Sequence, residues 1–349
     1  MARVTIQNIA DRLGISKFAV SRALTGKSGV SEATRQLVLA TATELGYDMR
    51  RRGPEPGKAI EVIFKDRTVA SRELWIDVQH GVDSEAVRLG YSMAVRWTDD
   101  PGILKRLEAS TAGFVFIGPQ SPAMFEAIRT CQVPSVVVNH LVPPLVKVDQ
   151  IAATDIEAGV YVARFLAALG HRRLVYAHGR LGYPGRYARL KGFAEAISVI
   201  EGVELREIAF EDDQAANGFR DALLAMVDSG FEPTAFFCGS DGVAVTVMSE
   251  LMRMGLRVPE DVSVVGHADY GIATQISPQL TTVHMPHRQM GVAAVRLLLA
   301  RAGLFGFLEG LPTQRVNLVP HLVERQSTGP ATSDSWRGRL RAPALQRQE

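Results

Sequence analysis

From Ala59 onward, short apolar runs alternate with stretches of helical periodicity, and this alternation constrains the fold more than any other feature of the chain. It is typical of parallel strands joined by helices that cover both faces of a sheet. The helical stretches include Trp75–Leu89 and Ala158–Leu169. The strand-like runs are AIEVIF, YSMAVRW, GFVFIG, SVVVNH, RLVYAHG, TAFFCG and VSVVGH. We therefore expect doubly wound α/β sheets, with ligands bound at the carboxyl ends of the strands.

Three short helical patterns precede this body. The first, Ile6–Leu13, has Thr5 as its N-cap and is ended by Gly14, because glycine readily adopts the left-handed conformation. A second helix follows over Lys17–Leu24, and Ser31 begins a third. Two helices joined by a tight turn, with a third completing a small core, predict an all-α helix-turn-helix head over residues 1–47.

In a helix-turn-helix, the second helix enters the major groove of DNA. Lys17 and Arg22 lie on its polar face and can donate to guanine, while Phe18 can press on a thymine methyl group. Hydroxyl groups near the helix ends can bind phosphates. The predicted DNA contacts in the head are Thr5, Ser16, Lys17, Phe18, Ser21, Arg22, Thr25 and Ser31.

Charge is distributed unevenly along the chain. The net charge is +2 overall, but residues 1–58 hold ten Lys and Arg against five Asp and Glu, and residues 59–328 hold 25 against 30. A basic head on an acidic body favours a polyanionic partner for the head alone. A small, well-solvated domain is the alternative explanation of the same charge.

Several segments resemble, in order, the lactose/galactose repressor (LacI/GalR) family of bacterial transcription regulators. They are TIQNIADRLGISKFAVSRALTGKSGVSEATRQLVLATATELGY, GHRRLVYAHG, RLKGFAEAI, AFFCGSDGVAVTVMSELMRMGLRVPEDVSVVGHADY, SPQLTTVHMP and HLVERQST. The resemblance implies a two-lobed, periplasmic-binding-protein-like (type I) body over residues 59–328, completed by the late segment 284–328. It also implies an effector that binds in the cleft between the lobes.

The linker, residues 48–58, departs from the family. Members usually carry a hinge helix there whose Leu enters the minor groove, whereas DMRRRGPEPGK has no Leu, and its prolines and glycines disfavour a helix. Arg50, Arg51 and Arg52 remain predicted contacts to phosphates or to a narrow minor groove.

The resemblance also suggests residues for the effector site. Leu74 and Trp75 match apolar positions after the first strand, although Trp75 also fits a core tryptophan on an amphipathic helix. Arg189 matches the family arginine that reaches the effector, with a surface ion pair as the alternative. Asp241 matches a carboxylate that accepts from ligand hydroxyls, with helix capping as the alternative.

A second departure lies in GHADY, where the family usually has Gly-Phe-Asp-Asp. His267 and Ala268 replace the Phe and the first Asp. The resemblance implies that this Asp often contacts the effector, so in this chain Asp269 or His267 would have to make that contact. Gln120 and Phe210 are further candidates for the lining of the cleft.

The remaining sequence patterns give weaker indications of function. The loop GRLGYPG, residues 179–185, does not have the GxGxxG spacing of a dinucleotide site, and the two histidines of HMPH lack further metal ligands. Cys131 and Cys238 fit buried, reduced thiols. No run is apolar enough to span a membrane, and the N-terminus lacks a signal-peptide pattern, which predicts a cytoplasmic protein.

These features predict a homodimeric transcription regulator, a repressor that reads a pseudo-palindromic operator and responds to a sugar, a sugar acid or a related effector. We expect no cofactor, no metal and no enzyme activity, because no catalytic constellation is present. A solute-binding protein with the same body is the main alternative, and the predicted head argues against it. Residues 329–349 are Pro-, Gly-, Ser- and Arg-rich and are predicted to be disordered.

Overall fold

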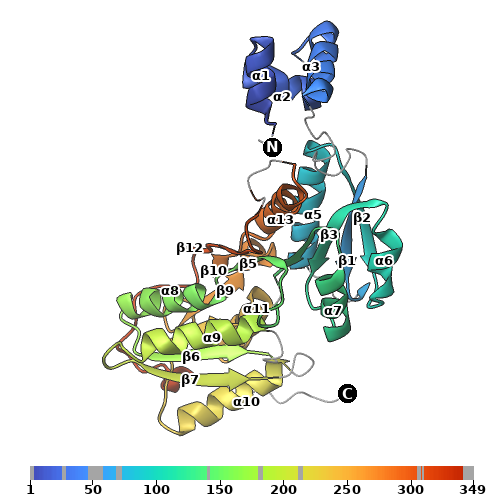
Figure 1. Cartoon of the computed structure of the whole chain (residues 1–349). Coiled ribbons are helices and arrows are strands. Elements are labelled where there is room, and N and C mark those ends of the chain that lie inside the picture. Colours follow the sequence, from blue (N-terminus) through green and yellow to red (C-terminus); the bar gives the residue numbers. More distant parts are fainter. Residues whose placement is uncertain are drawn as a thin grey trace.

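The structure is a computed structural model and describes residues 4–25, 29–45, 58–67, 73–139, 142–179, 184–210, 215–304, 308 and 310–340. These residues form a helical head and two α/β lobes (Figure 1). The predicted fold class is therefore confirmed.

The head consists of α1 (Ile6–Leu13), α2 (Lys17–Thr25) and α3 (Glu32–Glu44). Thr5 and Asn8 form a capping box at the start of α1, and Gly14 ends that helix at φ 62°. The side chain of Ser31 accepts from the backbone of Thr34 and caps α3. The small core packs residues of all three helices together: Ile9, Ala10, Val20, Ala23, Leu24, Val38 and Ala42.

Each lobe contains one six-stranded sheet. In lobe 1 the strand order is β11-β5-β4-β3-β1-β2, and all neighbours run parallel. In lobe 2 the order is β12-β10-β9-β8-β6-β7, with only β12 antiparallel among its described pairs. The strands of lobe 1 are β1 (Ala59–Phe64), β2 (Ser92–Trp97), β3 (Thr111–Ile117), β4 (Ser135–Val138), β5 (Asp149–Ala153) and β11 (Arg315–Leu318). Those of lobe 2 are β6 (Arg173–His178), β7 (Glu204–Ala209), β8 (Ala235–Cys238), β9 (Ser263–Ala268), β10 (Thr281–His284) and β12 (His321–Val323).

Helices cover both faces of each sheet, as the continuous burial of the central strands requires. In β3, Phe114 and Phe116 pack toward α6 and α7, whereas Val115 and Ile117 pack beneath α5 and α13. The helices of lobe 1 are α5 (Glu73–Arg88), α6 (Gly102–Leu107), α7 (Pro122–Thr130) and α13 (His287–Arg301). Those of lobe 2 are α8 (Asp155–Ala168), α9 (Pro184–Ile197), α10 (Ala215–Asp228), α11 (Asp241–Arg253) and α12 (Ile272–Gln275).

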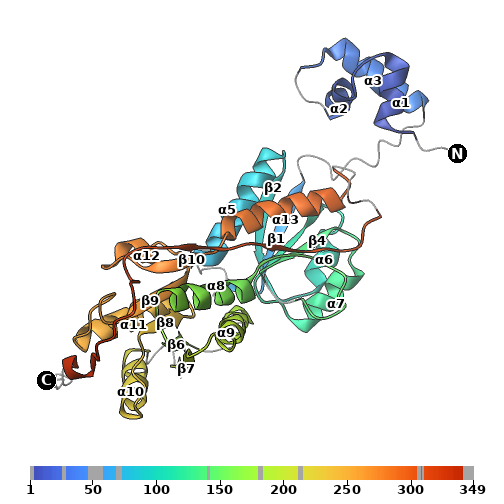
Figure 2. The same ribbon diagram turned by 90° about the vertical axis from the view of Figure 1, so that its left-hand side faces the viewer.

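The chain passes between the lobes three times. It crosses from β5 to α8, returns from β10 to α13, and crosses again from β11 to β12. Figures 1 and 2 show these connections running between the two sheets. Short connections of this kind allow the lobes to rotate as bodies while each sheet stays intact.

Paired glycines let two helices in each lobe pack backbone against backbone. In lobe 1, a Cβ atom on Gly81 of α5 would lie 1.9 Å from the carbonyl oxygen of Arg288, at the crossing with Gly291 of α13. In lobe 2, a Cβ atom on Gly159 of α8 would lie 2.2 Å from the carbonyl oxygen of Arg189 on α9. Each helix pair therefore behaves as one rigid layer of its lobe.

The C-terminal segment differs from the prediction. Residues 329–340 pack along the amino ends of the lobe 2 strands, and Trp336 is buried, with its indole N–H donating to the Pro233 carbonyl at 2.9 Å. The backbone N–H of Gly329 donates to the Ser263 hydroxyl at 3.1 Å. The prediction of disorder from residue 329 is therefore wrong as far as residue 340, because one buried tryptophan anchors a segment of otherwise polar composition.

The glycine crossings make a direct prediction about stability. Gly81→Ala should lower the free energy of unfolding by about 1–3 kcal/mol, because α5 and α13 must separate to admit one methyl group. Gly242→Ala is the matched control, since a Cβ atom at that helical position meets nothing closer than 3.9 Å. Urea unfolding followed by circular dichroism measures both, and equal stabilities for the two variants would contradict the close crossing.

Candidate DNA-reading head and ligand cleft

The exposed face of α2 carries the residues expected to read DNA bases. Lys17 is exposed, and Phe18 is 68% exposed, an unusual position for a phenylalanine on a small domain. The Arg22 guanidinium lies 5.1 Å from the centre of the Phe18 ring, so the two side chains form one surface. Ser21 is half-buried beside them. This arrangement fits a recognition helix, whose contacts to DNA stay a prediction.

The predicted phosphate-binding hydroxyls already have structural partners. Thr5 and Ser31 cap α1 and α3, and Ser16 accepts from the Ala19 N–H at 3.1 Å at the start of α2. Helix N-termini also attract phosphates, so a capping role leaves a phosphate contact open. The Thr25 side chain, the linker apart from Lys58, and all three linker arginines lie outside the described residues.

Arg189 is the centre of a buried polar cluster in lobe 2, where the effector site is predicted. It is 8% exposed, and its Nη1 donates to Asp155 Oδ1 at 2.5 Å and to His267 Nε2 at 3.3 Å. Its Nη2 donates to the Gly239 carbonyl at 2.8 Å. These partners come from the start of α8 and the ends of β9 and β8. They gather at the carboxyl edge of the sheet, where doubly wound folds bind ligands.

Burial sets the charge state of this cluster. Burial raises the pKa of Asp155, and the charge and hydrogen bond of Arg189 oppose that rise. Burial also lowers the pKa of His267 well below its usual value, and the Arg189 charge lowers it further. His267 is therefore neutral at physiological pH and accepts from Arg189 through Nε2. Within the cluster, the positive charge of Arg189 is balanced by Asp155.

Among the described residues, four buried side-chain atoms have no hydrogen-bond partner, and two of them belong to residues predicted to bind the effector. One is Nε of Arg189 in lobe 2, and the other is Oε1 of Gln120 in lobe 1. Gln120 is 7% exposed, and its amide nitrogen makes only long contacts of 3.3 and 3.4 Å to the carbonyls of Ile117 and Gly118. An unpaired buried donor or acceptor costs about 1–3 kcal/mol, so such atoms mark places for a ligand or water.

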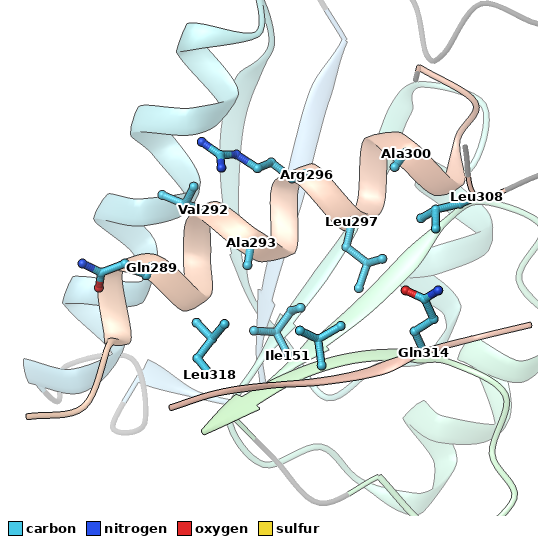
Figure 3. A pocket seen from close by; sticks show the side chains of 11 residues that line it. Ile151, Gln289, Val292, Ala293, Arg296, Leu297, Ala300, Leu308, Gln314 and Leu318 are labelled. Carbon is cyan, nitrogen blue, oxygen red and sulfur yellow. The ribbon is translucent and has the colours of Figure 1, made fainter. Parts of the chain in front are cut away.

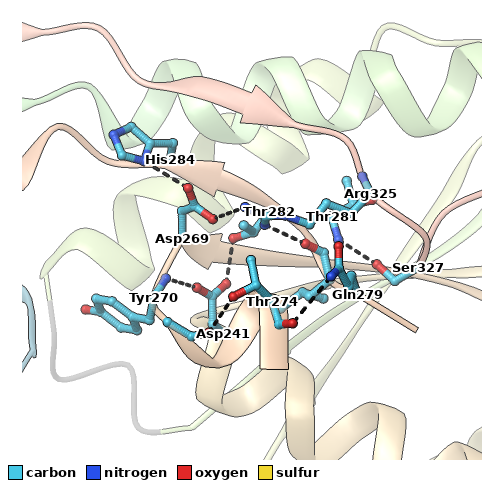
Figure 4. A network of polar contacts seen from close by, with 12 residues as sticks. Asp241, Asp269, Tyr270, Thr274, Gln279, Thr281, Thr282, His284, Arg325 and Ser327 are labelled. Carbon is cyan, nitrogen blue, oxygen red and sulfur yellow. Dashed lines mark hydrogen bonds and ion pairs between the residues drawn. The ribbon is translucent and has the colours of Figure 1, made fainter. Parts of the chain in front are cut away.

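Asp241 is fully buried, and each of its carboxylate oxygens accepts a hydrogen bond from the protein (Figure 4). Oδ1 accepts from the Thr282 hydroxyl at 2.5 Å, and Oδ2 accepts from the Tyr270 N–H at 2.7 Å. Helix α11 is capped by Ser240, which accepts from Val243, and not by Asp241. Each carboxylate oxygen of Asp241 thus already accepts one hydrogen bond from the protein, and a contact to a ligand stays a prediction. Its carboxylate also positions the turn that follows β9.

Asp269 lies in that turn and is also committed to protein partners (Figure 4). Its carboxylate accepts from His284 Nδ1 at 3.0 Å and from Arg325 Nη2 at 2.6 Å. Ala268 and Asp269 have φ values of 121° and 59°, which is strained for the alanine and tolerated by the aspartate. The ion pair of Asp269 with Arg325 and its hydrogen bond with His284 hold the turn in this conformation.

The predicted apolar lining is mostly core. Trp75 is 6% exposed and packs into the sheet beneath α5, with half-buried Leu74 against the same core. Phe210 packs edge-on against Phe219, with ring centroids 6.0 Å apart. The alternative interpretation of Trp75 as a core residue therefore describes its packing, and Phe210 is a core residue of lobe 2.

Three residues that contribute to this region were not predicted: Glu73, Asp155 and Tyr270. Asp155 follows β5, whose sequence DQIAA is too short and too polar to be recognised as a buried strand. Recognition of that strand would have identified Asp155 as a carboxylate at a strand end.

A separate cavity of about 560 Å³ lies on lobe 1 between α13 and strands β5 and β11 (Figure 3). None of the predicted effector residues borders it. It is lined by Ile151, Gln289, Val292, Ala293, Arg296, Leu297, Ala300, Leu308, Gln314, Val316 and Leu318.

Comparison with known proteins identifies both parts of the chain. The model for "Bacterial regulatory proteins, lacI family" matches residues 5–49, and that for a periplasmic binding protein-like domain matches residues 163–328. Together they span more than half of the chain. The chain belongs to the LacI family of bacterial regulators.

Full-length relatives of this LacI-family chain are similar throughout. The transcriptional regulator DegA of Bacillus subtilis is 26% identical over 342 residues, covering 94% of this chain and 99% of its own. A solved complex of the regulator CelR with cellobiose has a TM-score of 0.64 at 24% identity and covers 93% of this chain and 100% of its own. The lac repressor dimer bound to operator and the anti-inducer ONPF has a TM-score of 0.63 at 24% identity, covering 94% and 100%. The structural likenesses concern the fold.

These findings support a DNA-binding transcription regulator over the solute-binding alternative. They point to a family of regulators rather than of enzymes. The family match to the head ends at residue 49, just before the three linker arginines. Lobe 1 up to β5 lies outside the body match but has the same doubly wound plan.

Two exclusions apply to the described part of the chain. None of its helices is long and apolar enough to cross a membrane. Its His, Cys, Asp and Glu side chains form no group of three or more arranged for a metal ion.

Asp241 makes stability depend on pH. Burial raises its pKa to about 6 from 3.8, so the folded protein holds this proton more tightly than the unfolded chain does. Its contribution is therefore fully present below pH 3.8, and about 3 kcal/mol is lost as pH rises through 6. Asp241→Asn should remove this slope, because an amide can accept from Tyr270 and donate to Thr282.

Urea unfolding at a series of pH values from 4 to 7.5 measures the effect. Asp221→Asn, which removes an exposed carboxylate from the same lobe, should keep the wild-type slope. A wild-type slope in the Asp241→Asn variant would show that this carboxyl does not titrate near pH 6.

Proposed function

We propose that this regulator is a cytoplasmic, homodimeric repressor whose operator affinity is controlled by a neutral, polyhydroxylated ligand, a sugar or sugar derivative, in the cleft. The observation that carries the proposal is the pair of unpartnered buried atoms, the Nε donor of Arg189 and the Oε1 acceptor of Gln120. A hydroxyl group both donates and accepts, so a polyol satisfies both atoms. The cellobiose bound to CelR is a ligand of this chemical class.

The charges of the cleft favour a neutral ligand over a sugar acid. Arg189 is paired with Asp155 at 2.5 Å, and His267 beside them is neutral. Asp269 is paired with Arg325 at 2.6 Å. An anionic ligand would bring an unbalanced charge into a site whose positive charge is already neutralised, at a large desolvation cost.

The two unpartnered atoms also suggest how the ligand acts. Gln120 extends from lobe 1 and Arg189 from lobe 2, so one ligand that bonds to both stabilises a particular arrangement of the lobes. Two heads joined through a dimer would read the two halves of a pseudo-palindrome. A change in lobe arrangement then shifts the separation of the heads and the affinity for the operator.

Arg189→Ala should weaken ligand binding about 10- to 100-fold, because it removes a charged hydrogen-bond donor from a buried site. Operator affinity without ligand should stay near that of wild type, since the head has its own core. Calorimetry with candidate sugars, together with operator binding with and without the ligand found, measures both.

Two further variants serve as a second test of the site and as a control. Gln120→Met removes the unpartnered acceptor while keeping the side-chain volume, and it should weaken ligand binding without the cost of an unpaired Asp155. Lys191→Ala, an exposed position on α9 whose ammonium lies 3.8 Å from Glu195, should bind normally. If both Arg189→Ala and Gln120→Met responded to the ligand as wild type does, the proposed location of the ligand site would be wrong.

Arg22→Ala should cost about 1–3 kcal/mol on the cognate operator and relax the preference at one base pair, because a bidentate contact to guanine is lost. Binding of randomised operator libraries followed by sequencing measures this change. Arg12→Ala, which removes an exposed charge from α1, should leave every base preference intact. An unchanged preference profile for Arg22→Ala would exclude the docking of α2 as the reading helix.

A further inference from the structure

The turn formed by residues 268–271, between β9 and α12 of lobe 2, also contacts lobe 1. The backbone N–H of Gly271 donates to Glu73 Oε1 at 2.9 Å. Glu73 is the first residue of α5, and 198 residues of sequence separate the two partners. The hydrogen bond therefore joins the lobes directly, apart from the three chain crossings.

The 268–271 turn is held in a fixed conformation within lobe 2. Buried Asp241 accepts from the Tyr270 N–H at 2.7 Å, and Asp269 accepts from Arg325 and His284 (Figure 4). The strained φ of 121° at Ala268 persists because these bonds determine the path of the backbone. These bonds within lobe 2 therefore also fix the orientation of the following backbone N–H, that of Gly271, which donates to Glu73.

The same turn meets lobe 1 a second time through Tyr270. Its ring stacks on the imidazole of His287, with centroids 6.1 Å apart and planes inclined by 22°. His287 is the first residue of α13 and is buried. Burial lowers the pKa of His287 to about 4, so a neutral ring faces the tyrosine.

The two points of contact belong to one rigid part of lobe 1. Helices α5 and α13 cross at Gly81 and Gly291 with no room for a Cβ atom on either residue. The turn therefore touches the first residue of each helix in a packed pair. A displacement of the turn relative to that pair requires the loss of both contacts, because neither helix can move alone.

We propose that Glu73 is a positioning residue that latches the 268–271 turn to lobe 1 and holds the lobes together before any ligand arrives. The hydrogen bond needs an acceptor at this place, and a carboxylate in the first turn of a helix is favoured by the helix dipole. The latch rests on contacts in the structure alone. Its effect on ligand affinity rests on the proposed function, since a pre-closed cleft binds a ligand more tightly.

The test compares three variants of the full-length protein. Glu73→Ala removes the acceptor, Glu73→Gln keeps a neutral acceptor, and Asp77→Ala removes a carboxylate one turn further along α5. Hydrogen exchange of the peptide covering residues 268–276 should rise about 2- to 10-fold in Glu73→Ala, which corresponds to one net hydrogen bond. Small-angle scattering should show a larger radius of gyration for that variant.

Glu73→Gln should restore most of the protection, and Asp77→Ala should behave as wild type. Unchanged exchange in Glu73→Ala, or equal exchange in the Ala and Gln variants, would overturn the latch. Where a sugar ligand is found, its affinity should fall in Glu73→Ala by about the same factor as the exchange rises. Altered exchange in a protein that binds none of the sugars would support the latch and count against the proposed ligand.

Discussion

The buried ion pair between Arg189 and Asp155 is the interaction on which the cleft depends. A guanidinium this deeply buried is tolerated only when a carboxylate and further acceptors surround it. Asp155 is available because it begins α8 directly after the first crossing between the lobes, and α8 lies close to α9 because Gly159 removes a side chain from their interface. The helix crossing brings the pair together, and the pair in turn fixes Arg189 with one N–H unpaired. Core packing and the position of this buried charge are therefore coupled, because the same helix crossing determines both.

Local patterns in the sequence were enough to predict the head and the fold class. The caps at Thr5 and Ser31 and the stop at Gly14 lie where the sequence predicts them, because capping depends on neighbouring residues only. The strands that were missed, β5, β7, β10 and β11, are short or polar, and they are identified by pairing with strands far away in sequence. Trp336 was missed for a similar reason, since only its distant partner Pro233 distinguishes it from a disordered residue.

The residues predicted for the effector site differ in how many hydrogen-bond partners the protein gives them. Arg189 was predicted from its resemblance, and its burial agrees with that role. Asp241 was predicted in the same way, but both of its oxygens are occupied by Thr282 and Tyr270. Sequence shows that a carboxylate follows β8, whereas only the fold shows which donors surround it. A residue type at a given position in the sequence therefore does not by itself show whether its side chain is free to bind a ligand.

The segment GHADY has other residues than the family resemblance leads one to expect, and its side chains make different contacts. His267 occupies the expected phenylalanine position and, kept neutral by burial, accepts from Arg189. Ala268 takes the place of a carboxylate, and the remaining Asp269 turns to His284 and Arg325 instead of the cleft. The remaining carboxylate of this segment is thereby bonded within the protein. The groups left in this region are a neutral, buried imidazole and two buried atoms without a hydrogen-bond partner among the described residues, the Nε of Arg189 and the Oε1 of Gln120, a set that suits hydroxyl groups better than charges.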